Sequence, residues 1–281
     1  MNYILYNPLS NGGTCIEKAN KLSQKLDKQK KENKCISLLD INDIQAFLDS
    51  IYEEDIIIIV GGDGTLYRMA NKLYNYDLKG KNVYLAKAGT GNDFYRDLKK
   101  KEIDGLVKID KFLASAPSAV SENKTYYFNN SCGIGVDGDI CDRVNKSEKK
   151  SSINYLLTCL KAVFNFKRFS LNINVDGKSS IHEKVWFTAI MNGKYFGGGM
   201  KVAPKQNRDD DVFTVVIVEK VPTILLVFIL PTIYLGLHTI FKRYVKIVKG
   251  KDIEILTDSP KLCEIDGDIL GNINKIKTTK K

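Results

Sequence analysis

Five consecutive β-branched residues, Ile56–Val60, run directly into the sequence Gly61-Gly62-Asp63-Gly64-Thr65. A uniformly apolar run that ends in turn residues is typical of a strand buried on both faces, as the strands of parallel sheets are. Helix-compatible residues follow as far as about Tyr76. This feature predicts a strand, a glycine-rich turn and a helix in series, which is the repeating unit of an α/β sheet.

The same pattern occurs twice more in the first 100 residues. Tyr3–Tyr6 leads into a turn over residues 7–13, and Val83–Ala86 leads into the turn Gly89–Asp93. The carboxyl ends of parallel strands meet at one edge of a sheet, so we expect the three turns to converge on one ligand crevice. Glycines let backbone N–H groups approach phosphate oxygens, and helix N-termini favour anions. The N-terminal part is therefore expected to be an α/β nucleotide-binding domain.

The chain is basic, with 43 Lys and Arg against 33 Asp and Glu and a formal net charge of +10. This excess favours an anionic partner, but a Lys-rich composition bias on the surface explains it equally well. Nucleic acid is not expected, because only six of the 43 are Arg and no binding motif is present. Six cysteines without a C-x-x-C pair and only two histidines argue against a structural zinc site. The N-terminus lacks the features of a signal peptide, which predicts a cytoplasmic location.

After about Glu122 the sequence changes to short strand-like runs separated by turn residues. These runs are Thr125–Asn129, Ser170–Val175, Val185–Met191, Val212–Glu219, Tyr244–Val248 and Ile253–Leu256. They predict a β-rich second domain over residues 123–281, after a first domain over 1–122, with a C-terminal end that packs back on the first. One core helix is expected from the spacing of Ile153, Leu156, Leu157, Leu160, Val163 and Phe164. The Lys-rich C-terminus is expected to fray.

Residues 221–241 form a run of 21 residues without Asp, Glu, Lys or Arg. The length suits a membrane span, but Pro222, Pro231, Gly236 and His238 interrupt the run. Strand-like segments flank it on both sides, so a span would divide one β domain across the membrane. We expect a helix that is buried or lies at an interface, with membrane docking favoured.

Asp63 is the informative residue of the central turn. A carboxylate in an anion-binding loop would repel phosphate unless it bound Mg²⁺ or accepted a proton. Asp93 in the third turn is left open between a metal ligand, a substrate anchor and a helix N-cap. No G-x-x-x-x-G-K-[ST] sequence occurs, which excludes a P-loop.

The full set of motifs, in order, resembles the diacylglycerol kinase-like lipid kinase family, which includes sphingosine kinases and bacterial lipid kinases. The matching segments are Asn7-Pro8-x-Ser10, Gly61–Thr65, Gly89–Phe94, Asn192-Gly193-x-x-x-Gly197-Gly198-Gly199-Met200-x-x-Ala203-Pro204 and Glu264–Asp268. The central motif alone also fits NAD kinases and 6-phosphofructokinases. The resemblance implies an NAD kinase/phosphofructokinase-like α/β domain, a β-sandwich-like C-terminal domain, ATP as donor, Mg²⁺, and a lipid hydroxyl as acceptor.

The resemblance also implies roles for individual residues. ATP contacts are expected at Asn7, Pro8, Leu9, Ser10, Asn11, Gly61, Gly62, Asp63, Gly64, Thr65, Leu66, Tyr67 and Thr90. Asn92 and Asp93 are candidates for substrate or metal binding. In the loop Pro204–Val215, the Asp210 side chain and the main-chain carbonyls of Asn207 and Val212 are expected to hold a structural Mg²⁺. The chain departs from the family by placing Asp211 where Gly is usual and Thr214 where Asp is frequent.

The last motif of the family usually ends in Glu, the general base, where this chain has Asp268. The shorter side chain matters because a misplacement of about 1 Å can cost on the order of 10²-fold in rate. Asp63 is the competing base. We assign the base to Asp268, and we expect Asp63 to place Mg–ATP and the acceptor hydroxyl.

The resemblance implies a lipid kinase that uses ATP and Mg²⁺ to convert diacylglycerol to phosphatidic acid, and together with the apolar run it predicts a cytoplasmic protein that is peripherally bound to the inner face of the membrane. Lys242, Arg243, Lys246 and Lys249 follow the apolar run and suit an anionic leaflet. Two alternatives stay open: NAD kinase-like phosphorylation of a soluble acceptor, and a catalytically weak nucleotide- or lipid-binding protein. Whether the chain forms a homodimer is also open.

Overall fold

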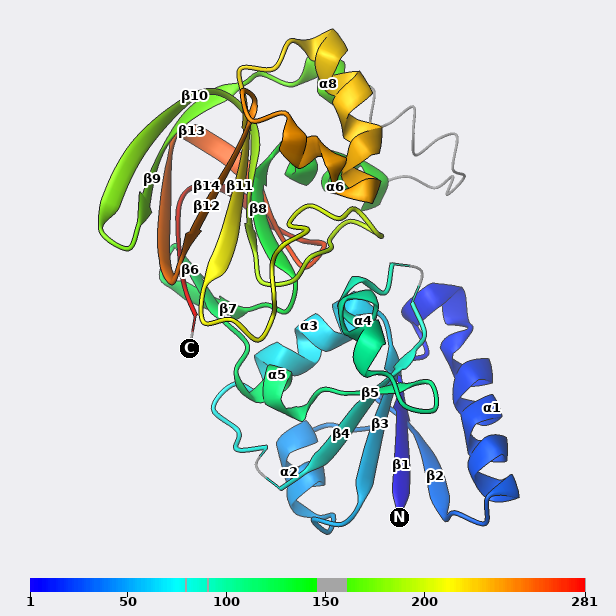
Figure 1. The fold of residues 1–281 in the computed structure, drawn as a ribbon. Coiled ribbons are helices and arrows are strands. Elements are labelled where there is room, and N and C mark those ends of the chain that lie inside the picture. The colour runs from blue at the N-terminus through cyan, green and yellow to red at the C-terminus, as the bar shows by residue number, and fades with distance from the viewer. Residues whose placement is uncertain (79, 90, 146–160, 281) are drawn as a thin grey trace. The chain divides into compact units, whose positions relative to one another are not determined.

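The first of two compact units, Met1–Ala116, is built on a five-stranded sheet of order β2-β1-β3-β4-β5. The computed structural model describes residues 1–78, 80–89, 91–145 and 161–280 (Figure 1). Strands β1 to β4 are parallel, with Ile4 beside Ile58 and Ile58 beside Tyr84, and β5 is antiparallel to β4. The strands are β1 (Asn2–Tyr6), β2 (Asn33–Ser37), β3 (Ile56–Gly61), β4 (Asn82–Lys87) and β5 (Leu106–Lys108).

Helices lie between the strands, so the predicted alternation of strand and helix is confirmed. They are η1 (Ser10–Gly13), α1 (Cys15–Lys28), α2 (Ile44–Asp49), α3 (Asp63–Lys72), α4 (Asp93–Leu98), η2 (Lys99–Lys101) and α5 (Asp110–Ala114). The apolar side of α1, with Cys15, Ala19 and Leu26, packs on buried residues of β1 and β3. The buried parallel strand predicted at Ile56–Val60 is confirmed, since Ile57 to Val60 are at most 1% exposed.

The second unit, Pro117–Lys281, is an antiparallel nine-stranded sheet. Its strands are β6 (Ser118–Ser121), β7 (Lys124–Tyr127), β8 (Ser131–Gly135), β9 (Phe169–Val175), β10 (Lys178–Met191), β11 (Phe213–Glu219), β12 (Val245–Gly250), β13 (Asp252–Ile265) and β14 (Asp268–Thr279). The two longest strands are β10 and β13. Each pairs with β9 along one half of its length and with β8 along the other half. The sheet therefore curls, and the β-rich character predicted for this part is confirmed.

Two expectations for this unit need correction. The Lys-rich C-terminus does not fray: β14 pairs with β13 and β6, and Ile276, Thr278 and Lys280 alternate as buried residues at its end. The expected core helix is described only from residue 161, and Ile153, Leu156, Leu157 and Leu160 lie outside the described residues. Within the described part, Val163 is buried but Phe164 is 62% exposed, so Phe164 is not a core residue.

The apolar run 221–241 folds into α8 (Thr223–Ile229), η3 (Leu230–Leu235) and η4 (Leu237–Ile240). The run is broken where Pro231 enters η3 and where Gly236 takes a left-handed conformation with φ 74°. Leu226, Ile229 and Ile233 face the core of the unit. None of the helices in the described part of the chain has the length and apolar character needed to cross a membrane.

Candidate active site

Two of the predicted turns touch each other through glycine backbones. A Cβ atom added at Gly89, after β4, would lie 2.8 Å from the Cα atom of Gly62, after β3. No side chain fits there without displacing the backbone. Gly61 is similarly confined by the side chain of Thr65. The glycines after β3 and β4 are therefore required by the close approach of the two turns, and the predicted convergence of these turns is confirmed.

Thr65 joins the first turn to the second. The Asn7 amide nitrogen donates to Thr65 Oγ1 at 2.9 Å, and the hydroxyls of Ser10 and Thr65 lie 2.9 Å apart. Asn7 also accepts the Leu9 N–H through its Oδ1 atom at 3.1 Å, which closes a local turn. Three predicted ATP-binding residues thus lie in one hydrogen-bonded group at the carboxyl ends of β1 and β3.

The other predicted ATP contacts have different surroundings. Leu9 is 70% exposed and Leu66 is 1% exposed, so Leu66 is a core residue and only its backbone is available to a ligand. Pro8 and Tyr67 are half-buried, and Gly64 is exposed at the start of α3. Thr90 and the Asn11 side chain lie outside the described residues.

Asp63 fixes the third turn. Its carboxylate accepts the N–H of Asp93 at 3.1 Å and the N–H of Phe94 at 2.9 Å, at the N-terminus of α4. One alternative for Asp93 was to cap the N-terminus of α4. In the structure Asp63, from another segment, caps this helix instead. Asp93 is 4% exposed and lies 3.5 Å from the Arg96 guanidinium.

Asn92 fastens the same turn from within. It has a left-handed backbone with φ 52°, its Oδ1 accepts the Gly89 N–H at 2.8 Å, and its amide donates to the Gly89 carbonyl. Two cationic groups lie beside the turn: Lys18 Nζ donates to the Ala88 carbonyl at 3.4 Å and Arg96 to the Gly91 carbonyl at 3.3 Å. The sequence did not single out Lys18, because it is one of many lysines on α1.

In the second unit, the segment Glu264–Asp268 forms the hairpin turn between β13 and β14. Asp266 and Gly267 are its two central residues, with φ 48° and 90°, and Ile265 pairs with Asp268. The Asp266 carboxylate accepts the backbone N–H groups of Asn129, Asn130 and Ser131 at 2.5, 2.7 and 3.1 Å. Asp268, the predicted base, is exposed at the start of β14. Sequence reasoning missed the holding role of Asp266.

The segment Asn129-Asn130 brings the other motifs of this unit together. Asn192 donates to the Asn129 carbonyl at 2.8 Å. Arg208, which is 6% exposed, donates to the same carbonyl and to Asn130 Oδ1 at 2.9 Å. Within the described residues the Asn129 side-chain amide, 2% exposed, has no hydrogen-bond partner. The Asn192-Gly193 and Glu264–Asp268 motifs therefore meet at one buried polar cluster.

Two buried acids lie behind the hairpin turn. A Cβ added at Gly133 would collide with the Asp137 carboxylate and lie 3.0 Å from Glu264 Oε1, so both carboxyl groups border Gly133. Burial raises the pKa of Asp137 to about 7, and burial together with Asp137 raises the pKa of Glu264. Glu264 Oε2 also accepts the Gly267 N–H at 2.9 Å. Glu264 therefore supports the hairpin turn from inside the unit, and Asp137 lies next to it.

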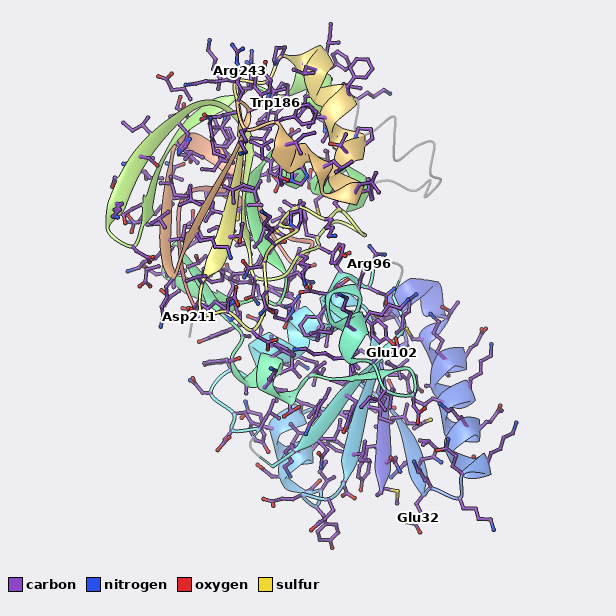
Figure 2. The ribbon with its side chains drawn as sticks, viewed as in Figure 1. Glu32, Arg96, Glu102, Trp186, Asp211 and Arg243 are labelled. Atoms are coloured by element: carbon purple, nitrogen blue, oxygen red, sulfur yellow. The ribbon has the colours of Figure 1, made fainter. Side chains whose placement is uncertain are left out.

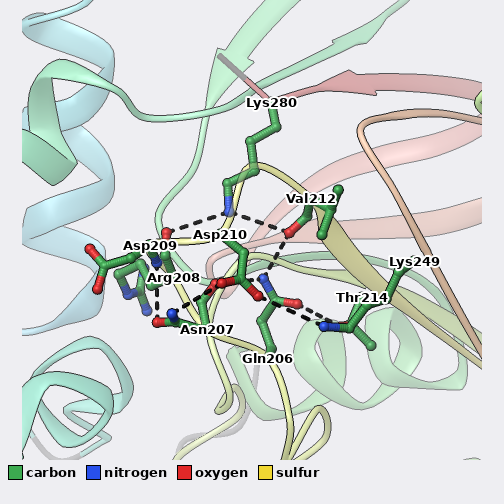
Figure 3. A network of polar contacts seen from close by, with 9 residues as sticks. All are labelled: Gln206, Asn207, Arg208, Asp209, Asp210, Val212, Thr214, Lys249 and Lys280. Carbon is green, nitrogen blue, oxygen red and sulfur yellow. Dashed lines mark hydrogen bonds and ion pairs between the residues drawn. The ribbon is translucent and has the colours of Figure 1, made fainter.

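The three expected ligands of a structural Mg²⁺ lie in one loop (Figure 3). Asp210 Oδ1 accepts the Asn207 amide at 3.1 Å, and its Oδ2 lies 3.8 Å from Lys249 Nζ. The Val212 carbonyl accepts Gln206 Nε2 at 2.9 Å and Lys280 Nζ at 3.5 Å. Burial lowers the pKa of Lys280 to about 8, so its amine is protonated at pH 7. The described residues contain no group of three or more His, Cys, Asp or Glu that could hold a metal.

Comparison with known proteins identifies the family of both domains. Residues 2–122 match the diacylglycerol kinase catalytic domain, and residues 130–279 match the YegS C-terminal NAD kinase beta sandwich-like domain. The chain is 30% identical over 236 residues to "putative lipid kinase YtlR" of Bacillus subtilis, covering 76% of this chain and 74% of that protein. It is 21% identical over 244 residues to a Mycobacterium tuberculosis diacylglycerol kinase, covering 83% and 78%.

A solved structure shares the fold. The crystal structure of a "putative diacylglycerol kinase" from Bacillus anthracis aligns with a TM-score of 0.69 at 20% identity, covering 99% of this chain and 92% of that one. The sequence match to YtlR extends over most of both chains, and the two domain matches follow one another as the two units do. The chain therefore belongs to the diacylglycerol kinase-like family of lipid kinases.

Proposed function

We propose that the protein transfers the γ-phosphoryl group of Mg–ATP to the free hydroxyl of diacylglycerol, giving phosphatidic acid and ADP. The observation that carries the proposal is the group of turns after β1, β3 and β4, where Thr65 is bonded to Asn7 and Ser10 and the backbone of Gly62 touches that of Gly89. Such glycine turns at helix N-termini suit phosphate groups. The family supports a lipid acceptor, and the name of the Mycobacterium tuberculosis relative supports diacylglycerol.

In the proposed reaction the acceptor hydroxyl oxygen bonds to the γ-phosphorus as the bond from that phosphorus to the β,γ-bridging oxygen breaks. The hydroxyl proton passes to the Asp268 carboxylate, and the bridging oxygen leaves with ADP. Asp266 holds the Asp268 turn through three backbone N–H groups, and Asp63 holds the third turn through two. Phosphoryl transfer depends mainly on positioning and on charge neutralisation, so these two aspartates act as positioning residues.

A panel of lipid alcohols tests the proposal. Purified protein would be incubated with Mg–ATP and mixed micelles of diacylglycerol, ceramide, sphingosine or an isoprenoid alcohol, and phosphatidic acid is the expected main product. Asp268→Asn should lower kcat by about 10²–10⁴-fold with little change in KM for ATP, whereas Asp268→Glu should keep activity. No phospholipid product, or phosphorylation of NAD without detergent, would contradict the proposal.

We also propose that an anionic bilayer is the source of the acceptor and that α8, η3 and η4 dock on it. Their outward side, named here the apolar face, consists of exposed residues: Ile224, Phe228 and Leu235 at 70%, Ile240 at 66% and Leu237 at 48%. The inward side is apolar too, whereas a water-facing helix normally has a polar outer face.

Cationic side chains adjoin the apolar face. Lys242 and Arg243 lie one residue beyond the end of η4 and are exposed. Figure 2 shows Arg243 and Trp186 at the α8 end of the second unit, and Trp186 Nε1 donates to the Val221 carbonyl at 2.9 Å, which anchors the start of the run. Apolar side chains with adjoining lysine and arginine match the acyl and headgroup layers of an anionic bilayer.

Vesicle sedimentation tests the docking. The protein should bind phosphatidylglycerol vesicles more strongly than phosphatidylcholine vesicles, and Phe228→Ser and Leu235→Ser should each weaken binding by about 10-fold. Ile181→Ser is the matched control, since Ile181 is 76% exposed in the same unit but lies on β10. Equal loss in all three variants, or none in any, would argue against the apolar face.

A further inference from the structure

The loop that connects β10 to β11 carries the expected Mg²⁺ ligands, but its carbonyl groups already have donors. The Asn207 carbonyl accepts Gln206 Nε2 at 3.0 Å and the Asp210 N–H at 3.0 Å. The Val212 carbonyl accepts Gln206 Nε2 and Lys280 Nζ. Gln206 is itself held, because the Thr214 hydroxyl donates to its Oε1 at 2.5 Å.

These contacts do not fit a divalent cation. A carbonyl oxygen has two lone pairs, and both are engaged at Asn207 and at Val212. Mg²⁺ requires near-octahedral oxygen ligands at about 2.0–2.1 Å, so it could reach these oxygens only by displacing the Gln206 amide and the Lys280 ammonium. Thr214, which stands where the family frequently has Asp, is used to fix Gln206 rather than to supply a ligand.

Positive charge at this loop comes instead from side chains. Lys280 Nζ lies 3.5 Å from the carbonyls of both Arg208 and Val212 and 5.6 Å from the centre of the Phe213 ring. Lys249 Nζ pairs with Asp210. Lys280 is 6% exposed, and its backbone N–H donates to the Lys251 carbonyl at 3.3 Å. The acidic run Asp209–Asp211 therefore faces tethered cations.

We infer that the ammonium group of Lys280 is an internal cation of the loop between β10 and β11, in addition to the buried Arg208, and that it replaces the structural Mg²⁺ that the family resemblance implies. It bridges two carbonyls of the loop from the end of β14, so it also ties the last strand of the sheet to the loop. The extra acid at Asp211 is balanced by lysine rather than by metal.

Metal binding without nucleotide tests this inference. The amount of Mn²⁺ bound would be measured by electron paramagnetic resonance for the wild type and for Asp210→Asn, and the two should bind equally. The double variant Lys280→Ala/Gln206→Ala removes both side-chain donors from the loop carbonyls. It should therefore bind one Mn²⁺ more than the triple variant that also carries Asp210→Asn. If the wild type bound one Mn²⁺ more than Asp210→Asn, the inference would be overturned.

Thermal unfolding gives a second readout. Lys280→Met keeps the apolar stem but leaves two carbonyls short of a donor, and it should lower Tm by about 3–6 °C in EDTA. Lys277→Met is the matched control, since Lys277 is exposed on the same strand, and its Tm should stay within about 1 °C of the wild type. An unchanged Tm for Lys280→Met would contradict the bridging role.

Discussion

Asp63 and Asp266 perform similar structural tasks in the two units. Each precedes a glycine, and each carboxylate binds backbone N–H groups of a distant segment. Asp63 holds two N–H groups at the start of a helix, whereas Asp266 holds three just before a strand. The first lies among glycine turns at the edge of its unit, and the second lies beside two buried acids. Both aspartates are half-buried, so the comparison teaches that they differ in the number of N–H groups they hold and in their neighbours, not in their exposure.

The largest effect is expected from Asp266→Asn. An amide offers one acceptor oxygen to three N–H groups, so the free energy of unfolding of the second unit should fall by about 3 kcal/mol. Asp63→Asn should lower that of the first unit by about half as much. The single tryptophan, Trp186, reports urea unfolding of the second unit by fluorescence, and far-UV circular dichroism reports the first. If both variants lost the same free energy of unfolding, the number of N–H donors would not determine how much each aspartate stabilises its unit.

Gly89→Ala should come next. Its methyl group would lie 2.8 Å from the Gly62 Cα atom, which forces apart the turns after β3 and β4. We expect a loss of about 2 kcal/mol in the first unit and, in the lipid kinase assay, about 10²-fold in kcat/KM for ATP. Gly64→Ala is the matched control for folding, because nothing lies within 4 Å of a Cβ there. A stability loss as large in Gly64→Ala would contradict the role of the close approach.

The effect of Asp137→Asn on the free energy of unfolding should depend on pH. Since burial raises the Asp137 pKa from its ordinary 3.8 to about 7, the folded unit holds a proton that the unfolded chain releases. In the wild type, the contribution of Asp137 to the free energy of unfolding is complete below about pH 4 and is lost as pH rises through 7. Asp137→Asn should therefore raise the free energy of unfolding by about 2 kcal/mol at pH 8 and by far less at pH 5.

The control for this pH dependence is Asp40→Asn, because Asp40 is exposed. Its effect on urea unfolding should be the same at pH 5 and pH 8. If Asp137→Asn stabilised the protein equally at the two pH values, the stabilisation would not come from the proton that Asp137 binds on folding.

The smallest effect is expected from Ser10→Ala. Thr65 retains the Asn7 amide as a partner when the Ser10 hydroxyl is removed, so the first unit should lose about 0.5–1 kcal/mol in the same urea titration. Asn7→Ala should cost more, because the Leu9 N–H loses its acceptor as well. If Ser10→Ala cost more than Asn7→Ala, Ser10 would contribute more than Asn7 to the stability of the first turn.

The sequence was most informative where local pattern decides structure. The apolar run before Gly61 and the alternation of strand and helix predicted the first unit, and the fold family followed from the ordered motifs. It was least informative where side chains from distant segments meet. Nothing near Asp266 marks Asn129 to Ser131 as its donors, and nothing in the spacing of Lys280 marks the loop that it enters. The C-terminal lysines suggested fraying, but Ile276, Thr278 and Lys280 alternate as buried residues and mark a paired strand.

The pairing of β8 with β13 has a consequence for the order in which the protein folds. Asn7 and Thr65 are 58 residues apart in the chain, whereas Ser131 and Glu264 are 133 apart. Contacts between more distant segments form more slowly, because a longer loop must be closed first. During synthesis the first unit has its complete sheet early, while β8 must wait for β13 to leave the ribosome. Nascent chains halted before residue 252 should thus carry a folded first unit beside an unfinished β sheet that depends on chaperones.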